Sequence, residues 1–480
     1  MKYFLAILLA TLSFCSISAQ EQLGLRLETY AGVSSLALNP AGNLNNPLKW
    51  DVNLVGGGIF IENNYAFLRE TSLLRLLKHR NDAVFVTATD LEGPISDRTF
   101  VADFFNDGAK RFVAMSGFVA GPSAALRLGE NHSVGIFTNL RSAGGSVNLP
   151  NEFSYYKYEA RPFNEQFEVP KMRAAAVNWA EIGLNYALKT PTADGSINFG
   201  INLKYLQGYE AGYVNSRSTY QHTKLPGNVV SIGLPNSEYG FAALSESSVF
   251  SERSGRGFGV DLGFTWISTE HEEGYRLKLG ASLLDMGFIN FDKNAQTHRL
   301  QLDSAVLVNL NDYENFELPA DITPLVKAFS ENVLADSLAT LQGTSFRMAL
   351  ASALGLQADF GATEFFYINA LYTQRIPIGI GPRRGNLLAV TPRLQHRWYS
   401  VSLPVSVYNW NRAHVGLAVR LGWLVLGSDD LAGAFYKKNY TGADFYFALK
   451  INPFNLSLDG FGDGGKRRFG SRSKVKCYTF

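Results

Sequence analysis

Long apolar runs are missing from this sequence, and their absence excludes one class of membrane protein. After the first 20 residues no apolar run reaches about 18 residues, the length that a membrane-spanning helix needs. Charge is also scarce, at 18% of 480 residues, and 44 Lys and Arg nearly balance 42 Asp and Glu. This balance predicts no nucleic-acid partner, since nucleic acids select for basic surfaces. Cysteine is nearly absent too, with only Cys15 and Cys477 in the chain.

Catalytic and metal-binding motifs are missing as well. The seven histidines are scattered, and neither His-Glu-x-x-His nor Gly-x-Ser-x-Gly occurs. The glycine run at 56–58 lacks the Lys-Ser/Thr pair of a phosphate loop, and the glycine-rich residues 255–259 open a strand, which a dinucleotide motif does not. We therefore predict no enzymatic activity, no cofactor and no metal. A catalytic site would need a carboxylate, a His and a Ser or Thr brought together by the fold.

The first residues have the pattern of a secretion signal. Lys2 gives a charged start, 4–14 form an apolar stretch, and the small residues 16–19 form a cleavage site, with the cut after Ala19 or Gln20. Cys15 leaves with this segment, so the mature chain cannot form an internal disulfide. The prediction is export by the Sec route to the outer membrane of a Gram-negative cell.

What the sequence does contain is alternation of apolar with polar or small residues. From Ile197 to Tyr205 the odd positions are apolar and the even positions are Asn, Gly, Asn and Lys, and the pattern returns at 258–266, 399–407, 415–425 and 445–451. Alternate side chains of a strand point to opposite faces, so each segment has one face for lipid and one for a lumen. The fold class predicted is all-β, a transmembrane antiparallel β-barrel of about 14 strands.

The predicted strands share this alternation and a length near ten residues. They span about 50–60, 112–128, 132–141, 180–189, 197–205, 257–266, 275–283, 299–308, 346–357, 364–373, 387–396, 399–407, 415–425 and 445–451.

Loop lengths predict the orientation of the barrel. With the first strand rising from the periplasm, long segments at 61–110, 142–176, 208–255 and 427–441 fall outside the cell, and short turns at 129–131, 191–195, 270–274 and 409–412 fall inside, as expected. The exception is 309–344, which falls inside. Either its helix lies under the barrel or the strand at 299–308 is wrong.

Two helices are predicted in the connections. Residues 71–77 suit a short capped helix, and 321–341 are apolar at helical spacing with Asp321 as the N-cap.

These patterns divide the chain into a signal peptide (1–19), a plug-like segment (20–48), the barrel (49–452) and a basic, glycine-rich, periplasmic tail (453–480). The tail cations are Lys466, Arg467, Arg468, Arg472, Lys474 and Lys476. Such a tail is either a solvated chain or a contact for an acidic partner or for anionic headgroups.

Several short motifs resemble known outer-membrane proteins. The segment Leu38-Asn39-Pro40-Ala41-Gly42 before a barrel resembles FadL-type transporters of hydrophobic compounds. The segments 282–287 (SLLDMG), 424–431 (LVLGSDDL), 441–446 (TGADFY) and the tail with Lys476-Cys477 are similar to an uncharacterised Bacteroidota family of outer-membrane barrels. The first resemblance implies that 20–48 is a plug inside the barrel, with Asn39, Pro40, Ala41 and Gly42 at its turn, and that ligands pass through a lateral opening. FadL-type transporters lack the tail, whereas type IX secretion barrels share their fold and serve as binding partners.

Two functional hypotheses follow. The first is an outer-membrane barrel that binds or transports hydrophobic small molecules, with outer-membrane lipid and a hydrophobic ligand as partners. The alternative is a non-transporting barrel of an envelope machine, such as type IX secretion or gliding, with a periplasmic protein partner bound through the basic tail.

Overall fold

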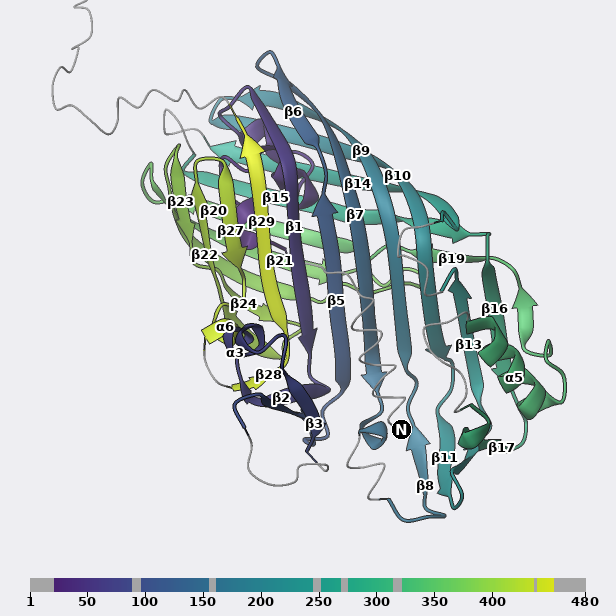
Figure 1. Ribbon diagram of the computed structural model, residues 1–480. Coiled ribbons are helices and arrows are strands. Elements are labelled where there is room, and N and C mark those ends of the chain that lie inside the picture. Colours follow the sequence, from purple (N-terminus) through teal and green to yellow (C-terminus); the bar gives the residue numbers. More distant parts are fainter. Residues whose placement is uncertain are drawn as a thin grey trace, which may run out of the picture.

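The computed structural model describes residues 21–88, 96–154, 161–244, 252–268, 275–313, 322–435 and 438–452. The predicted signal peptide and the tail therefore lie outside the described residues. The core of the molecule is a closed antiparallel β-barrel (Figure 1). We call each position in its wall a stave, because some staves consist of two consecutive strands.

The barrel has 14 staves. In ring order these are β1 (Trp50–Asn63), β5 (Arg111–Ala120) with β6 (Ser123–Leu128), β7 (His132–Leu149), β9 (Arg173–Thr192), β10 (Gly195–Ser216), β14 (Gly255–Ser268), β15 (Leu277–Phe291), β19 (Phe346–Ala349) with β20 (Ala353–Gly361), β21 (Phe366–Arg375), β22 (Leu387–Gln395), β23 (Tyr399–Ser402) with β24 (Val405–Tyr408), β25 (Arg412–Val415) with β26 (Leu417–Leu421), β27 (Leu424–Ser428) and β29 (Ala443–Ile451). The barrel closes where Gly57 of β1 pairs with Phe447 of β29.

The predicted number of staves is confirmed, although two of the predicted strands are wrong. Residues 299–308 do not form a stave, since β16 (Ala295–Gln301) pairs with β13 (Asn236–Ala242), and β17 (Val306–Asn309) with β12 (Val229–Gly233). Residues 415–425 belong to two staves, β25–β26 and β27, which pair from Leu417–Ser428 to Leu421–Leu424. Gly422 adopts the left-handed conformation, with φ 58°, that a two-residue hairpin turn requires. Apolar residues on both sides of this turn hide it in the sequence, and the two errors cancel.

With the strands assigned in this way, each connection named below can be placed at one of the two ends of the barrel. Connections at 129–131, 193–194, 362–365, 396–398 and 422–423 lie at one end of the barrel, together with the start of β1 and the end of β29. We call this the short-turn end, and the opposite end the long-loop end. The turn at 409–411 and the segment 292–352, with its helix α5 (Ile322–Leu334), lie at the long-loop end. The prediction that 409–412 lies with the short turns is therefore wrong, and α5 does not lie under the barrel.

The predicted faces of the wall are confirmed by burial. On β10, Phe199 and Leu203 are each 53% exposed, whereas Asn198 and Asn202 are 1% exposed. The same contrast holds on β23, where Tyr399 is exposed and Ser400 is buried. Apolar side chains thus cover the outside of the wall, and polar side chains point into the lumen.

None of the described helices is long and apolar enough to cross a membrane.

Loops build two further sheets at the long-loop end. One has the order β28 (Lys438–Tyr440), β2 (Ala66–Thr71), β4 (Thr99–Phe104) and β3 (Val84–Thr87), and the other β17, β12, β11 (Tyr220–Leu225) and β8 (Gln166–Val169). The remaining elements here are the strand β18 (Leu341–Gly343), the helices α3 (Leu73–Lys78) and α6 (Ala432–Phe435), and the 3-10 turns η3 (Asn151–Phe153) and η4 (Leu310–Tyr313). The predicted helix near 71–77 is present, and the Ser72 side chain accepts a hydrogen bond from Arg75 N at its start. The predicted cap Asp321 lies outside the described residues.

Candidate functional site

The N-terminal segment 21–46 lies inside the barrel toward its short-turn end (Figure 1). It consists of α2 (Leu23–Arg26), η1 (Gly32–Ala37) and η2 (Gly42–Asn45) joined by turns. Its apolar side chains, including Leu23, Leu27 and Leu36, are almost fully buried against the inner wall. The segment therefore occupies lumen that the barrel wall alone would leave for water.

Polar contacts with one side of the wall hold the first half of this segment. The Asp429 carboxylate accepts hydrogen bonds from Leu23 N and from the Tyr446 hydroxyl, and that hydroxyl accepts one from Gly24 N. Glu28 forms a buried ion pair of 2.7 Å with Arg420. Both Asp429 and Tyr446 belong to motifs that suggested the Bacteroidota family, and here they anchor the segment.

The second half contacts the opposite wall at the predicted turn. Asn39 Nδ2 donates to the carbonyl oxygens of Phe264 (3.0 Å) and Ala281 (3.3 Å), and Asn185 Nδ2 donates to Pro40 O at 2.9 Å. A Cβ on Gly200 would overlap the Pro40 carbonyl carbon, so only glycine allows this approach.

Ala41 and Gly42 complete the turn through hydrogen bonds from their amides to Asn39. Asn39, Pro40 and Ala41 thus lie against the inner wall, and Gly42 closes the turn within the segment. Their role as a plug stays a prediction.

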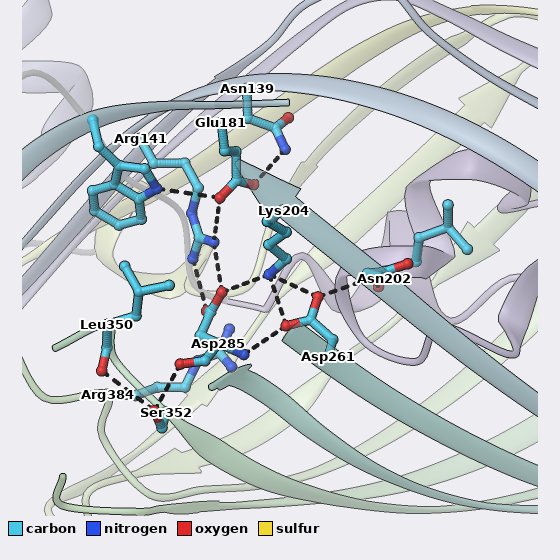
Figure 2. Close-up of polar contacts among 12 residues, drawn as sticks. Asn139, Arg141, Glu181, Asn202, Lys204, Asp261, Asp285, Leu350, Ser352 and Arg384 are labelled. Atoms are coloured by element: carbon cyan, nitrogen blue, oxygen red, sulfur yellow. Dashed lines mark hydrogen bonds and ion pairs between the residues drawn. The ribbon is translucent and has the colours of Figure 1, made fainter. Parts of the chain in front are cut away.

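A buried ionic cluster crosses the lumen beside the segment (Figure 2). Arg141 on β7 donates two hydrogen bonds, 2.9 and 3.0 Å, to the Asp285 carboxylate on β15, and it pairs with Glu181 on β9 at 3.3 Å. Lys204 on β10 lies 2.7 Å from Asp261 and 2.8 Å from Asp285. Arg141 and Lys204 thus balance most of the charge of the three carboxylates, and the contacts tie together staves that are not neighbours in the wall.

Neutral side chains complete this cluster. Asn139 and the Trp179 indole donate to Glu181 at 2.8 and 3.2 Å, and Asn202 donates to Asp261 at 2.9 Å. The Arg141 guanidinium also lies over the Trp179 ring, 4.8 Å from its centroid. Since buried charges are costly unless paired and hydrogen-bonded, this network is a built feature of the lumen.

Asp285 owes its position to a β-bulge. The register between β14 and β15 shifts between Val260 and Leu262, and Asp285 adopts φ 54°, which is rare for a residue other than glycine. Its amide donates to Asp261 at 2.7 Å, and its carbonyl oxygen accepts from Ser352 Oγ at 2.7 Å. The backbone turn aims the Asp285 carboxylate across the lumen at Arg141.

A cavity of about 150 Å³ lies between the N-terminal segment, β1, β5, β7 and the ionic cluster. Its apolar lining includes Leu25, Leu36, Phe60, Phe118 and Phe137. At one side are Arg26, which lies over the Phe118 ring, and the ion pair between Glu21 and Arg384 (2.9 Å). The cavity therefore has a mixed lining, with several aromatic and aliphatic side chains and several charged ones.

The long-loop end of the lumen is also filled. The connection 376–386 folds inward, where Ile380 O accepts from Ala349 N at 2.7 Å and the Gly385 amide donates to the Tyr408 hydroxyl at 2.9 Å. Beside it, Trp179, Tyr213, Phe291 and their neighbours form a packed core within the wall. The cavity is thus enclosed by structure toward both ends of the barrel.

The remaining predicted site residues, Lys466 to Lys476 of the tail, lie outside the described residues. Among the residues that the structure describes, no group of three or more His, Cys, Asp or Glu side chains could hold a metal ion. The ionic cluster was not among the sites predicted from the sequence. Its signal was the presence of Lys204 and Asp261 at inward-facing positions of strands whose other inward residues are small or neutral.

Comparisons with known proteins show a family and find solved structures of loose similarity. A family model described as a family of unknown function, DUF5723, matches residues 40–429, and no curated protein matches. The toluene transporter TodX of Pseudomonas putida aligns with 9% identity and a TM-score of 0.40, over 88% of this chain and 94% of TodX. The toluene transporter TbuX of Ralstonia pickettii aligns with 9% identity and a TM-score of 0.29, over 88% and 94% of the two chains.

The monoaromatic hydrocarbon channel CymD aligns with 8% identity and a TM-score of 0.32, over 91% of this chain and 97% of CymD. These superpositions are too loose to transfer the substrates of those channels to this chain.

Proposed function

The chain belongs to the family of unknown function DUF5723, and we propose that it is an outer-membrane barrel that binds a hydrophobic small molecule inside its lumen and passes it on. The observation that carries the proposal is the cavity between the N-terminal segment and the inner wall. A cavity of about 150 Å³ with a partly apolar lining is large enough for a benzene-sized ligand. The aromatic rings of Phe60, Phe118 and Phe137 give such a ligand apolar contacts.

Movement of the N-terminal segment is the proposed means of passage. The segment forms one wall of the cavity, and its hydrogen bonds run to side chains and carbonyl groups of the barrel, so it can leave without opening the strand ladder. Lateral passage is also part of the proposal. An apolar groove of about 650 Å³ lies on the lipid-facing side of Phe199, Leu262 and Phe264, at the place where Pro40 contacts the wall from inside.

Binding is tested with 4-fluorotoluene and ¹⁹F NMR on the purified full chain. Ala114→Phe places a ring in the cavity, whereas Val119→Phe, on the outer face of the same strand, serves as the control. The proposal predicts a bound resonance for wild type and for Val119→Phe, and its loss in Ala114→Phe with the barrel still folded. Equal signals from all three proteins would show that the probe only dissolves in the detergent, and this would contradict the proposal.

Passage is tested in cells. A strain that lacks the gene should take up a hydrophobic substrate more slowly, with recovery by wild type and not by Ala114→Phe. Normal uptake in the deletion strain would contradict the transport role, while the proposed binding would still stand on the NMR result.

Location in the outer membrane of a Gram-negative cell, after Sec-type cleavage near Ala19, is part of the same proposal. It is supported by the closed barrel with an apolar exterior.

A second proposal is a partner role in an envelope machine, favoured by the cations between Lys466 and Lys476. The helix α5 gives this role no support, because it lies at the long-loop end, whereas β29 ends at the short-turn end. Purification of the full chain with and without 453–480 tests this role, and identical sets of bound proteins would exclude it.

A further inference from the structure

A second cavity, of about 150 Å³, lies at the long-loop end between the connection 376–386 and the inner faces of β5, β7, β9 and β10. Four arginines line it: Arg173, Arg375, Arg383 and Arg384. Its described lining contains no Asp or Glu. Arg173 is exposed and the other three are half-buried, so the cavity is open to solvent. The guanidinium groups gathered along it repel each other.

Three of these arginines have no anionic partner among the described residues. Arg384 pairs with Glu21, but no ion pair or side-chain hydrogen bond involves Arg173, Arg375 or Arg383. Buried charges elsewhere in this lumen, such as Arg141, Lys204 and Arg420, each have a carboxylate within 3.3 Å. The three arginines of the second cavity differ from these cations in two ways: they are more exposed, and they have no carboxylate partner among the described residues.

The three side chains come from separate elements that converge on one space. Arg173 begins β9, Arg375 ends β21 and Arg383 lies in the connection 376–386. Burial, followed by the charges of Arg173 and Arg375, lowers the pKa of Arg383, which reflects this proximity. Neutral polar residues also line the cavity, including Tyr408, Asn215 and Asn409.

We propose that this arginine-lined cavity is a binding site for a multiply charged anion, a phosphate group carried either by a free phosphate compound or by a lipid headgroup. A single carboxylate would balance one of the three unpaired guanidinium groups. A phosphate carries nearly two charges at neutral pH and offers several oxygens to the paired donors of each arginine. The cavity volume suits a group of this size and leaves no room for a large apolar body.

The site differs from the one proposed for hydrophobic molecules. The two cavities share Ala114, Arg383, Arg384, Gly385 and Tyr408 in the wall between them, whereas Arg173 and Arg375 line only the second. Arg384 is bound to the N-terminal segment through Glu21, so it is left unchanged in the test.

The experiment uses the full chain purified in mild detergent, with wild type, the double variant Arg173→Gln/Arg375→Gln and the control Arg299→Gln. Arg299 lies on β16 at the same end, outside the cavity, and bonds to Gln301. Calorimetric titration with inorganic phosphate, pyrophosphate and acetate tests a free anion. Native mass spectrometry tests a co-purified lipid with a phosphate-bearing headgroup. Loss of heat-modifiable migration identifies any variant that fails to fold.

The proposal predicts that phosphate or pyrophosphate binds wild type and Arg299→Gln alike, and that affinity falls roughly tenfold or more for each arginine removed from the cavity. If only the phosphorylated lipid is retained, and is lost in the double variant, the headgroup is the source and the site stands. Equal binding of acetate and phosphate would overturn the phosphate assignment. Binding that persists in the folded double variant, or no bound anion of either source, would overturn the site itself.

Failure of the anion-site proposal can be distinguished from failure of the proposed binding of hydrophobic molecules. 4-Fluorotoluene binding should be the same in wild type and in Arg173→Gln/Arg375→Gln, because neither residue lines the first cavity.

Discussion

Arg141 and Asp285 are 144 residues apart in the sequence, yet the guanidinium of one donates to the carboxylate of the other at 2.9 and 3.0 Å. Their strands, β7 and β15, are separated in the wall by β9, β10 and β14. The pair therefore spans the lumen. Together with Lys204 and Asp261, it lines one side of the first cavity.

Loss of the Asp285 charge should destabilise the barrel strongly. Asp285→Asn keeps the side-chain shape and tolerates the positive φ, but it leaves Arg141 and Lys204 with too few anions, which costs about 3–5 kcal/mol when a buried pair is broken. The measurement is denaturant unfolding in detergent. The exposed Asp303→Asn should change the free energy of unfolding by less than about 0.5 kcal/mol. Equal stability of the two variants would mean that the ion pair between Arg141 and Asp285 does not stabilise the barrel.

The outer face should reject charge where it meets hydrocarbon. Leu203→Arg, on an outward side chain that is 53% exposed, should cost about 2–4 kcal/mol if the residue lies near the bilayer midplane. Leu307→Arg, on β17 at the long-loop end, is 62% exposed to water and should cost almost nothing. Folding into lipid vesicles measures both, and a cost at Leu307 as large as that at Leu203 would contradict the assigned membrane boundary.

Contact between Pro40 and the wall depends on the absence of a side chain at Gly200. Gly200→Ala should displace the N-terminal segment, because the added Cβ overlaps the Pro40 carbonyl carbon. Hydrogen exchange of amides in 36–44 should quicken while the strand ladder stays protected. Gly343→Ala, where a Cβ makes an ordinary contact with Thr297, is the control. Unchanged protection in Gly200→Ala would show that this contact does not hold the segment.

The sheet that contains β11 should loosen in acid. Burial, with a smaller effect from Arg161, lowers the pKa of His222 to about 4, and the ring packs against Phe153 and Phe167. The unfolded chain, with a His pKa of about 6.5, binds the proton first, so the stability of this sheet is full above that pH and falls as the pH drops toward 4. Hydrogen exchange of Tyr220–Leu225 should therefore show more frequent opening at pH 5 than at pH 7.5 after correction for intrinsic rates. His222→Phe should remove the difference, and a difference that survives this substitution would exclude His222 as its cause.

Sequence alternation predicted the barrel because the pattern within each strand indicates which side chains face outward and which face the lumen. The pattern at 197–205 correctly predicted that Phe199 faces outward and that Asn202 faces the lumen. It failed where two staves meet at Gly422 in one unbroken apolar pattern, and at 299–308, where a strand of the long-loop end has the same local signal as a stave.

The ionic cluster and the arginine-lined cavity could not be predicted from the sequence, for a different reason. Arg141 and Asp285, or Arg173 and Arg375, meet only because the wall curves round and closes, and no local spacing records that closure. The contact between Asn202 and the Leu36 carbonyl, at 3.1 Å, is of the same kind. It holds the side chain of Asn202 against the N-terminal segment.

The most direct test of the account is the position of a heavy-atom ligand. In a crystal of the full chain soaked with bromobenzene, the anomalous signal of bromine should lie among Phe60, Phe118 and Phe137, between the N-terminal segment and β5. A bromine signal confined to the lipid-facing groove at Phe199 and Phe264, with nothing in the lumen, would contradict it.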